Sequence, residues 1–360
     1  MGLKTMYQLN TLNFWHGKRV LLTGHTGFKG SWLSLWLQSL GSTLCGLAQN
    51  PPTEPALFKV AEVEKGMEHR VADIRDLVAV TTQIKEFQPE IIFHLAAQPL
   101  VRHSYRHPVE TYSTNVMGTV NVLEAARHSG SVKALVNITT DKCYENREWF
   151  YGYREDAPMG GHDPYSNSKG CAELVTSAYR KSFLKDAGIA VGSARAGNVI
   201  GGGDWASDRL IPDILHALEN GESVMIRNPF AIRPWQYVLE PLSGYLLLAE
   251  SLYQDGQTNA EGWNFGPNDE DARTVKWIVE YLCNNWGSDA SWILQPGDHP
   301  YESNFLKLDI SKSYQRLGWA PRWGLEAALR SVTEWHKSWL DGKDMHAVCL
   351  AQIKQFESRV

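Results

Sequence analysis

The stretch KRVLLTGHTGFKGSWLSLWLQSLG, residues 18–41, decides the fold. It opens with an apolar run of the kind that a buried parallel strand shows. The loop that follows has the glycine spacing G-x-x-G-x-x-G, formed by Gly24, Gly27 and Gly30, and an apolar-periodic segment then ends on Gly41. A strand, a glycine loop and a helix in this order predict a dinucleotide-binding unit, in which the amino terminus of the helix faces the phosphates.

The second strand is expected over residues 42–47 and is followed by Ala48, Gln49 and Asn50. A carboxylate at this place would hold the ribose hydroxyls of NAD, and an arginine nearby would accommodate the 2′-phosphate of NADP. The strand has neither, although the side chain of Gln49 or Asn50 has the polarity to reach a ribose. The choice between NAD and NADP therefore stays open at this strand.

Further strands and helices alternate as far as about residue 200. A third strand is expected to end within residues 71–76, a fourth to cover 90–95, and a sixth to cover 191–194, with a helix over 115–129. This alternation predicts a right-handed, doubly wound parallel sheet of the Rossmann type.

The pattern changes after residue 200, where glycine loops, short helices and isolated strands predict a smaller C-terminal α/β lobe that binds substrate. We therefore expect a Rossmann domain over 1–197, with a return segment near 235–262. The substrate lobe is expected over 198–234 and 263–360.

A central strand is expected at the start of ALVNITTDKCY, residues 134–144. The apolar run turns polar at Thr139, and Thr140, Asp141 and Lys142 follow. The carboxyl end of a central strand is where open α/β sheets bind ligands. Taken alone, these residues would more simply be a polar strand end that caps the next element.

Tyr165 and Lys169 are four residues apart and share one face of an expected helix. A phenol held beside an ammonium group is a device for proton transfer. By itself such a pair is more often a packed helix face. Its position behind a cofactor loop and a polar strand end favours catalysis.

Composition excludes several classes of function. The chain of 360 residues has 43% hydrophobic and 21% charged residues, as is ordinary for a soluble globular protein. A net charge of −5 argues against a nucleic-acid-binding surface. No window is long enough to span a membrane, and the first residues do not resemble a secretory signal. The five scattered cysteines have no metal-ligand spacing, so we expect no metal, a reducing compartment and a cytoplasmic location.

The motifs together resemble the extended short-chain dehydrogenase/reductases. They keep that family's order over nearly the whole chain: Thr23-Gly24 to Gly30, Asp73-Ile74, His94 to Ala97, Asn115, Tyr165-x-x-x-Lys169 and Arg195-x-x-Asn198. Thr140-Asp141 ahead of the Tyr-Lys pair is similar to the nucleotide-sugar 4,6-dehydratases within that family. This resemblance implies a tightly held NAD and CDP-D-glucose as substrate. The product would be a 4-keto-6-deoxy sugar nucleotide, a precursor of dideoxy sugars in surface polysaccharide.

The resemblance also implies the residues of the site. Those expected to bind the cofactor are Gly24, Thr26, Gly27, Phe28, Lys29, Gly30, Asp73, Ile74, Leu95, Ala96, Ala97, Asn115, Thr139, Tyr165 and Lys169. Those expected to bind the substrate are Gln98, Asn198, Arg209, Arg233 and His299, with Glu302 near the last. Arginine suits the diphosphate because it makes bidentate contacts to phosphate, although a lone arginine is usually a solvated surface charge.

The resemblance implies that Tyr165, as a phenolate, removes the proton of the sugar 4-hydroxyl. It also implies that Thr140 forms a hydrogen bond with the same oxygen. Ionising a tyrosine near neutral pH requires positive charge, which Lys169 and the nicotinamide would supply. Asp141, protonated through a raised pKa, would protonate the leaving 6-hydroxyl. A salt bridge between Asp141 and Lys142 is the structural alternative.

Lys142 departs from the relatives, most of which carry a glutamate there as the carbon-5 base. A lysine can act as a base only if burial or nearby cations lower its pKa well below about 10.4. Either Lys142 is that base, or it only modulates Asp141 and another group moves the proton.

Two other functions use the same residues. A nucleotide-sugar 4-epimerase needs the Tyr-Lys pair and NAD but has no use for an acid at carbon 6. A non-catalytic, NAD(P)-sensing binding protein could keep the fold alone. We also expect a homodimer or homotetramer, formed through the helix over 115–129 and the helix that carries Tyr165. No local residue identifies the nucleotide base.

Overall fold

The structure is a computed structural model that describes residues 14–287, 290–294 and 305–358. Its centre is a seven-stranded sheet in which every neighbouring pair is parallel, so the predicted doubly wound sheet is confirmed. The strand order is β11 (Gly262–Asn264), β6 (Ala190–Arg195), β5 (Ala134–Ile138), β4 (Ile91–His94), β1 (Arg19–Thr23), β2 (Thr43–Ala48) and β3 (Glu68–Val71).

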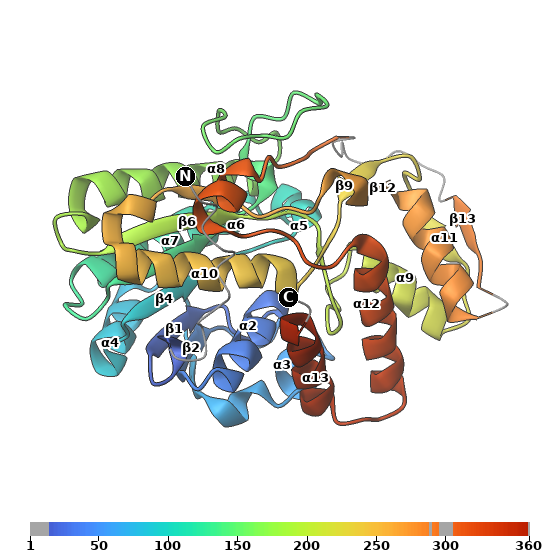
Figure 1. Ribbon diagram of the computed structural model, residues 1–360, viewed down its shortest axis with the longest axis horizontal. Coiled ribbons are helices and arrows are strands. Elements are labelled where there is room, and N and C mark those ends of the chain that lie inside the picture. The colour runs from blue at the N-terminus through green and yellow to red at the C-terminus, as the bar shows by residue number, and fades with distance from the viewer. Residues whose placement is uncertain (1–13, 288–289, 295–304, 359–360) are drawn as a thin grey trace, which may run out of the picture.

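Both faces of this sheet are buried, because side chains that alternate along each strand enter two different cores. Val20 and Leu22 of β1 pack with α2 (Phe28–Ser39) and α10 (Leu239–Asp255), whereas Leu21 packs into the opposite core. The helices of that second core are α4 (Leu77–Phe87), α7 (Gly118–Arg127) and α8 (Pro164–Tyr179). Figure 1 shows the resulting layers.

Most predicted elements form within a few residues of their expected bounds, with two differences. The helix expected from residue 115 begins in a π-helical turn, η2 (Ser113–Met117), which runs directly into α7. The strand that returns to the sheet is β11, whereas the leucine-rich residues 239–255 form α10, whose buried side chains cover the sheet instead.

The rest of the chain forms a lobe beside the carboxyl ends of the strands, on the right in Figure 1. Its helices are α9 (Leu210–Glu219), α11 (Val275–Trp286) and α12 (Leu325–Leu340). Three small ladders complete it: β7 (Val199–Ile200) with β10 (Gln236–Tyr237), β9 (Ile232–Pro234) with β12 (Ala272–Thr274), and β8 (Val224–Ile226) with β13 (Trp292–Leu294).

Helix α13 (Met345–Ser358) leaves this lobe and packs against α2, the helix that follows the glycine loop (Figure 1). The indole of Trp36 donates a hydrogen bond of 2.8 Å to Glu357, and the rings of Trp36 and Phe356 meet edge to face at 5.7 Å. The far end of the described chain therefore buttresses the first helix of the sheet domain.

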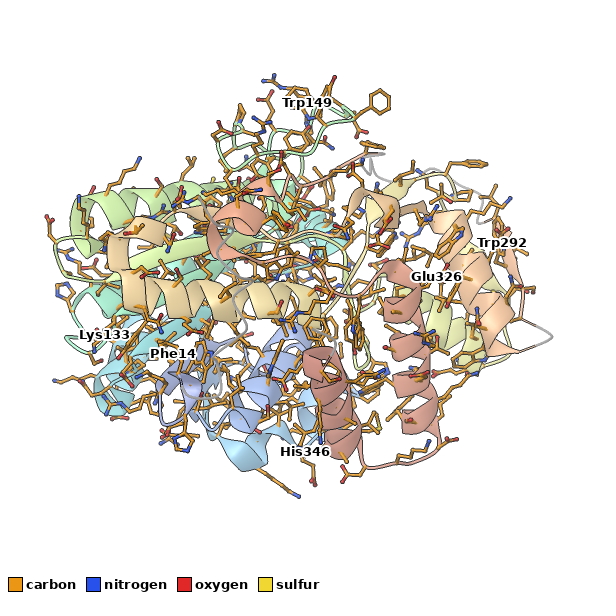
Figure 2. The ribbon with its side chains drawn as sticks, viewed as in Figure 1. Phe14, Lys133, Trp149, Trp292, Glu326 and His346 are labelled. Carbon is orange, nitrogen blue, oxygen red and sulfur yellow. The ribbon has the colours of Figure 1, made fainter. Side chains whose placement is uncertain are left out.

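Several short elements lie at the carboxyl edge of the sheet or on the surface. The helices among them are α3 (Leu57–Val60), α5 (Val101–Arg106), α6 (Pro108–Tyr112), η1 (Val63–Gly66), η3 (Asp141–Cys143), η4 (Arg180–Leu184), η5 (Gly256–Asn259), η6 (Asp269–Asp271) and η7 (Ser313–Leu317). The segment between η3 and α8 projects from the molecule, with Trp149 on its outer part (Figure 2). Among the described residues, no helix has both the length and the apolar character to cross a membrane.

Candidate active site

Strand β5 ends at the base of a cleft, and the polar residues after it turn into that cleft. The hydroxyl of Thr139 donates a hydrogen bond of 2.5 Å to Glu173. The hydroxyl of Thr140 donates one of 3.0 Å to Asp141 and accepts one of 3.3 Å from the backbone N–H of Lys142. Three of the four side chains expected at this strand end, those of Thr139, Thr140 and Asp141, are buried.

Asp141 is a carboxyl group in a dry environment. Asp141 is 1% exposed, and its Oδ2 atom has no hydrogen-bond partner among the described residues. Burial raises the pKa of Asp141, although the charge of Lys142 and the hydrogen bond from Thr140 oppose the shift. A raised pKa is the condition that a general acid near neutral pH requires.

Lys142 lies on the same turn but partly in solvent, where it lines the cleft. Within the described part of the chain, no ion pair joins it to Asp141, so the alternative of a structural salt bridge between these two side chains finds no support. The two groups instead interact at longer range, since the charge of Lys142 lowers the pKa of the carboxyl.

Tyr165 and Lys169 lie on one face of α8 and are both buried. Burial raises the pKa of Tyr165 to about 12, while the hydroxyl of Thr140 and the charge of Arg209 act to lower it. The amine of Lys169 donates a hydrogen bond of 3.3 Å to the carbonyl of Ile138, and burial lowers its pKa to about 8. We expected Lys169 to lower the pKa of Tyr165. The pKa is raised instead, because the desolvation of the buried phenol is the largest effect.

One group behind the strand end was missed by sequence reasoning. Glu173 continues the face of Tyr165 and Lys169 by one more turn and is buried. It accepts hydrogen bonds from Thr139, from Ser193 at 2.6 Å and from both Nε and Nη2 of Arg195 at 2.9 and 2.8 Å. The four-residue spacing after Lys169 was the signal that could have revealed it, because it places a carboxylate on the same helix face.

The glycine loop has the shape of a phosphate cradle. A side chain on Gly24 would meet the backbone of Ala96 at 2.6 Å, and one on Gly30 would meet the carbonyl of Gly24 at 2.2 Å, so both positions require glycine. Gly27 begins α2 without a side-chain cap, which leaves this helix end to an anionic ligand. Phe28 and Lys29 of the same loop line the cleft.

The polar residues beside the glycine loop mostly form hydrogen bonds with one another. The hydroxyl of Thr26 donates to the carbonyl of Gln49 at 3.0 Å, and the amide of Gln49 donates to Asp73 at 2.8 Å. Asp73 also pairs with Arg75, whose hydrogen bonds lower the pKa of the carboxyl. Ile74 is buried beneath them. Gln49 therefore stands near the end of β2 where a ribose-binding residue was expected.

The small residues after β4 lie next to the loop, and Asn115 fixes their backbone. The N–H of Leu95 bonds the carbonyl of Thr23 at 3.1 Å, and Ala96 and Ala97 follow at the strand end, partly exposed. The side chain of Asn115 bonds both backbone groups of Gln98, at 2.8 and 3.0 Å. These contacts give Asn115 a positioning role within the protein.

Gln98 differs from its expected place. Its side chain bonds the hydroxyl of Thr111 at 2.8 Å and the backbone N–H of Leu100 at 2.5 Å, and it does not belong to the cleft lining. These two hydrogen bonds hold the amide group of Gln98 outside the cleft lining.

Three of the residues expected to bind substrate line the cleft: Asn198, Arg209 and Arg233. Arg209 pairs with the buried carboxylate of Asp204 at 2.8 Å. Arg233 is fixed in the β9–β12 ladder, and its charge lowers the pKa of Asp141. His299 and Glu302 lie outside the described residues. The cleft has a volume of about 360 Å³, within the usual range for small-molecule sites.

A separate group of possible metal ligands lies outside this cleft. His103 of α5, His107 between α5 and α6, and Glu110 of α6 bring their ligand atoms within 4.8 Å of one another. None of the three belongs to the cleft lining, and the residues that do line it include no cluster of this kind in the described part of the chain.

Comparisons with known proteins agree with this arrangement. The family model described as GDP-mannose 4,6 dehydratase matches residues 21–332. The CDP-glucose 4,6-dehydratase of Salmonella typhimurium is 58% identical over 351 residues, which cover 96% of this chain and 98% of the relative.

Two solved structures are similar in fold. A dTDP-glucose 4,6-dehydratase from Streptomyces venezuelae, with NAD and TYD bound, has a TM-score of 0.76 and 21% identity, covering 91% of this chain and 99% of its own. The UDP-glucose 4-epimerase of Thermus thermophilus, in complex with NAD, has a TM-score of 0.77 and 25% identity, covering 89% and 99%.

Proposed function

This chain belongs to the GDP-mannose 4,6 dehydratase family, and from that membership we propose that it removes water from CDP-D-glucose to form CDP-4-keto-6-deoxy-D-glucose. The identity of 58% to a CDP-glucose 4,6-dehydratase supports this choice of substrate. The observation that carries the chemistry is Asp141, a buried carboxyl with a raised pKa at the base of a cleft that also holds Thr140, Lys142 and Tyr165.

NAD fits the glycine loop, because Gly24 and Gly30 admit no side chain and the first turn of α2 has no side-chain cap. When bound there, NAD supplies a hydride acceptor for carbon 4 of the sugar and a donor for carbon 6, which makes the net reaction redox neutral. The solved epimerase at 25% identity is a complex with NAD, which supports the same cofactor here. Gln49, bonded to Asp73, is the residue that we propose to meet the ribose.

Tyr165 takes the proton of the sugar 4-hydroxyl in this proposal, and Thr140 holds the oxygen. Its pKa of about 12 in the protein alone means that positive charge must come close before the phenol ionises at neutral pH. Lys169 lies one helical turn away, and with a pKa of about 8 it is mostly protonated at pH 7. The carbonyl of Ile138 accepts a hydrogen bond from that ammonium, and the charge of Glu173 raises its pKa.

The elimination needs a base at carbon 5 and an acid at carbon 6. Asp141 is suited to donate the proton to the leaving 6-hydroxyl, because burial favours its protonated form. Lys142 is the basic residue of the same turn and lines the cleft. We propose that it removes the proton from carbon 5. When the neutral amine of Lys142 takes that proton it becomes an ammonium group, and its new positive charge lowers the pKa of Asp141 and so favours release of the carboxyl proton to the leaving 6-hydroxyl.

Arg209, Arg233 and Asn198 are proposed to bind the diphosphate. The carboxylate of Asp204 neutralises the charge of Arg209. A bound diphosphate would compete with this carboxylate for the same guanidinium group. Both arginines act electrostatically on the catalytic end of the cleft, Arg209 on Tyr165 and Arg233 on Asp141. A diphosphate bound between them would lie directly beside the reacting sugar.

Incubation of the protein and NAD with CDP-, UDP-, dTDP- and GDP-glucose, followed by mass spectrometry, tests the function. Loss of one water from CDP-glucose supports the dehydratase. An epimerase, favoured by the similarity to a solved 4-epimerase, would give a product of unchanged mass but altered sugar configuration. A cofactor-sensing binding protein would give no product from any of the four.

We propose that the enzyme works as a homo-oligomer in a reducing compartment such as the cytoplasm. Apolar side chains on α6, η2 and α8 are exposed, including Val109 at 82%, Met117 at 51% and Leu174 at 60%. A second copy that packs its own α7 and α8 against these helices would cover them. The five cysteines are free thiols and four are buried, which supports the compartment.

A further inference from the structure

The lining of the cleft includes a second pair of charged residues besides Arg209 and Arg233, namely Arg227 and Asp213. Asp213 lies in the first turn of α9, and its backbone N–H bonds the carbonyl of Arg209 at 3.0 Å. Arg227 follows the last residue of β8, Ile226, which is buried. Regular elements thus hold both side chains at the cleft wall.

One donor of Arg227 is unused within the described part of the chain. Its Nη1 atom is buried and has no hydrogen-bond partner among the described residues, while Nη2 lies 3.9 Å from Oδ2 of Asp213. A buried donor without a partner costs free energy, so a ligand that brings an acceptor to this place is favoured by the hydrogen bond that it forms.

The carboxylate of Asp213 limits what that ligand can be. Its side chain is 46% exposed, and partial burial together with the charge of Asp208 raises its pKa to about 6, so it is ionised at neutral pH and would repel a phosphate. Arg209 and Arg233 meanwhile stand at the catalytic end, where they influence Tyr165 and Asp141. The Arg227–Asp213 pair therefore fits an uncharged group that presents an acceptor edge and a donor edge side by side.

The wall beside the pair is mixed, with apolar side chains next to a second ion pair, Arg102–Asp208, at 3.1 Å. Ile211, Ile214, Val224 and Ile226 line the cleft next to the two charged side chains, and all four are buried. A flat ring can lie on such a surface while its edge faces the arginine and the carboxylate. A nucleotide base has this combination of a hydrophobic face and a polar edge.

We propose that Arg227 and Asp213 identify the base of the nucleotide sugar as cytosine, an inference that rests on the proposed function. Arg227 donates to the O2 and N3 acceptors of cytosine, and Asp213 accepts from the 4-amino group. Uracil and thymine present an N3–H donor and an O4 acceptor at those places. Each would face a group of the wrong kind, an N–H against the guanidinium and a carbonyl against the carboxylate.

Two variants test the pair with CDP-glucose and UDP-glucose side by side. Asp213→Asn replaces the acceptor with an amide that can donate to O4 of uracil, so the ratio of kcat/KM for CDP- over UDP-glucose should fall about tenfold or more. Arg227→Gln should raise KM for CDP-glucose by a similar factor with little change in kcat. Calorimetric titration with CDP and UDP measures the same preference without turnover.

Glu222→Gln and Arg330→Gln are matched controls, because both side chains are exposed and lie outside the cleft lining. They should leave the preference between bases unchanged. Thermal unfolding shows whether each variant is folded. If Asp213→Asn weakened CDP and UDP equally, or if the wild type bound both equally, the assignment would be overturned. A wild type that prefers CDP in calorimetry but processes no nucleotide sugar would instead refute the proposed function and keep the base assignment.

Discussion

A side chain on Gly197 would place its Cβ atom 1.9 Å from Oδ2 of Asp141. The backbone after β6 thus packs directly against the carboxyl of Asp141. Because of this contact, residue 197 has no room for a side chain larger than the hydrogen atom of glycine. The position of the proposed acid depends on a glycine at the far side of the site.

Gly197→Ala should therefore displace Asp141 and lower kcat for CDP-glucose by about a hundredfold or more, as the loss of a general acid does. Steady-state kinetics at saturating CDP-glucose measure it. Gly287→Ala is the control, because a Cβ there meets nothing within 4 Å. Near-normal activity of Gly197→Ala would show that Asp141 has no acid role.

Asp141→Asn should abolish turnover yet make the protein more stable at neutral pH. The folded protein raises the pKa of this carboxyl, so the cost of ionising it in the folded state is small near pH 4 and grows as the pH rises through the raised pKa. The variant removes that cost. Its melting temperature should exceed that of the wild type by about 2 °C or more at pH 8, with a smaller difference near pH 4. An equal difference at both values would contradict the raised pKa.

Tyr165→Phe keeps the ring and removes the oxygen that is proposed to accept the 4-hydroxyl proton. The rate should fall by about a hundred- to ten-thousand-fold, while CDP-glucose binding, measured by calorimetry, should change little. Tyr179→Phe on the same helix is the control, since Tyr179 lies outside the cleft lining. Turnover at the wild-type rate would remove Tyr165 from the mechanism.

Lys142→Met separates the possible roles of the lysine. If Lys142 is the carbon-5 base, exchange of the carbon-5 hydrogen with deuterated solvent should stop while the 4-ketone still forms. If Lys142 only modulates Asp141, exchange should persist while loss of water slows. A purely structural lysine predicts a lower melting temperature and full activity of the folded enzyme. Exchange at the normal rate in this variant would exclude the base role, and Lys185→Met is the exposed control.

Leu174→Glu tests the proposed oligomer. Leu174 is 60% exposed on α8, so a charge there should not disturb the folded subunit but should oppose burial against a second copy. Sedimentation velocity should show a shift from an oligomer to a monomer, with the circular dichroism spectrum unchanged. An unaltered sedimentation coefficient would place the contact elsewhere.

The sequence predicted most where the signal is local. Residues 18–41 contain a strand, a loop and a helix whose glycines are required by contacts inside the same unit, such as Gly30 against Gly24. The short strand β11 escaped prediction because three residues have no periodicity, and β6 alone defines their pairing. The return segment near 235–262 was predicted without its elements, and its residues 239–255 form helix α10, whose leucines are buried on several sides.

In the site, the residue types were predictable and their environments were not. The order Thr140, Asp141, Tyr165 and Lys169 follows from motifs, but the pKa of Tyr165 depends on burial by distant segments. Gln98 shows the same limit, because the hydroxyl of Thr111 captures its amide. Arg227 and Asp213 have no motif at all, since a β-strand end and a helix start meet there only after folding.

The contact between α2 and α13 has a consequence for synthesis on the ribosome. Trp36 and Glu357, joined by a hydrogen bond, are 321 positions apart in the chain. Translation proceeds from the amino terminus, so the helix behind the glycine loop emerges long before the segment that buries its outer face. Until α13 has been synthesised, Trp36 lacks both its hydrogen bond to Glu357 and its ring contact with Phe356, so this part of the packing of α2 forms only after nearly the whole described chain has been made.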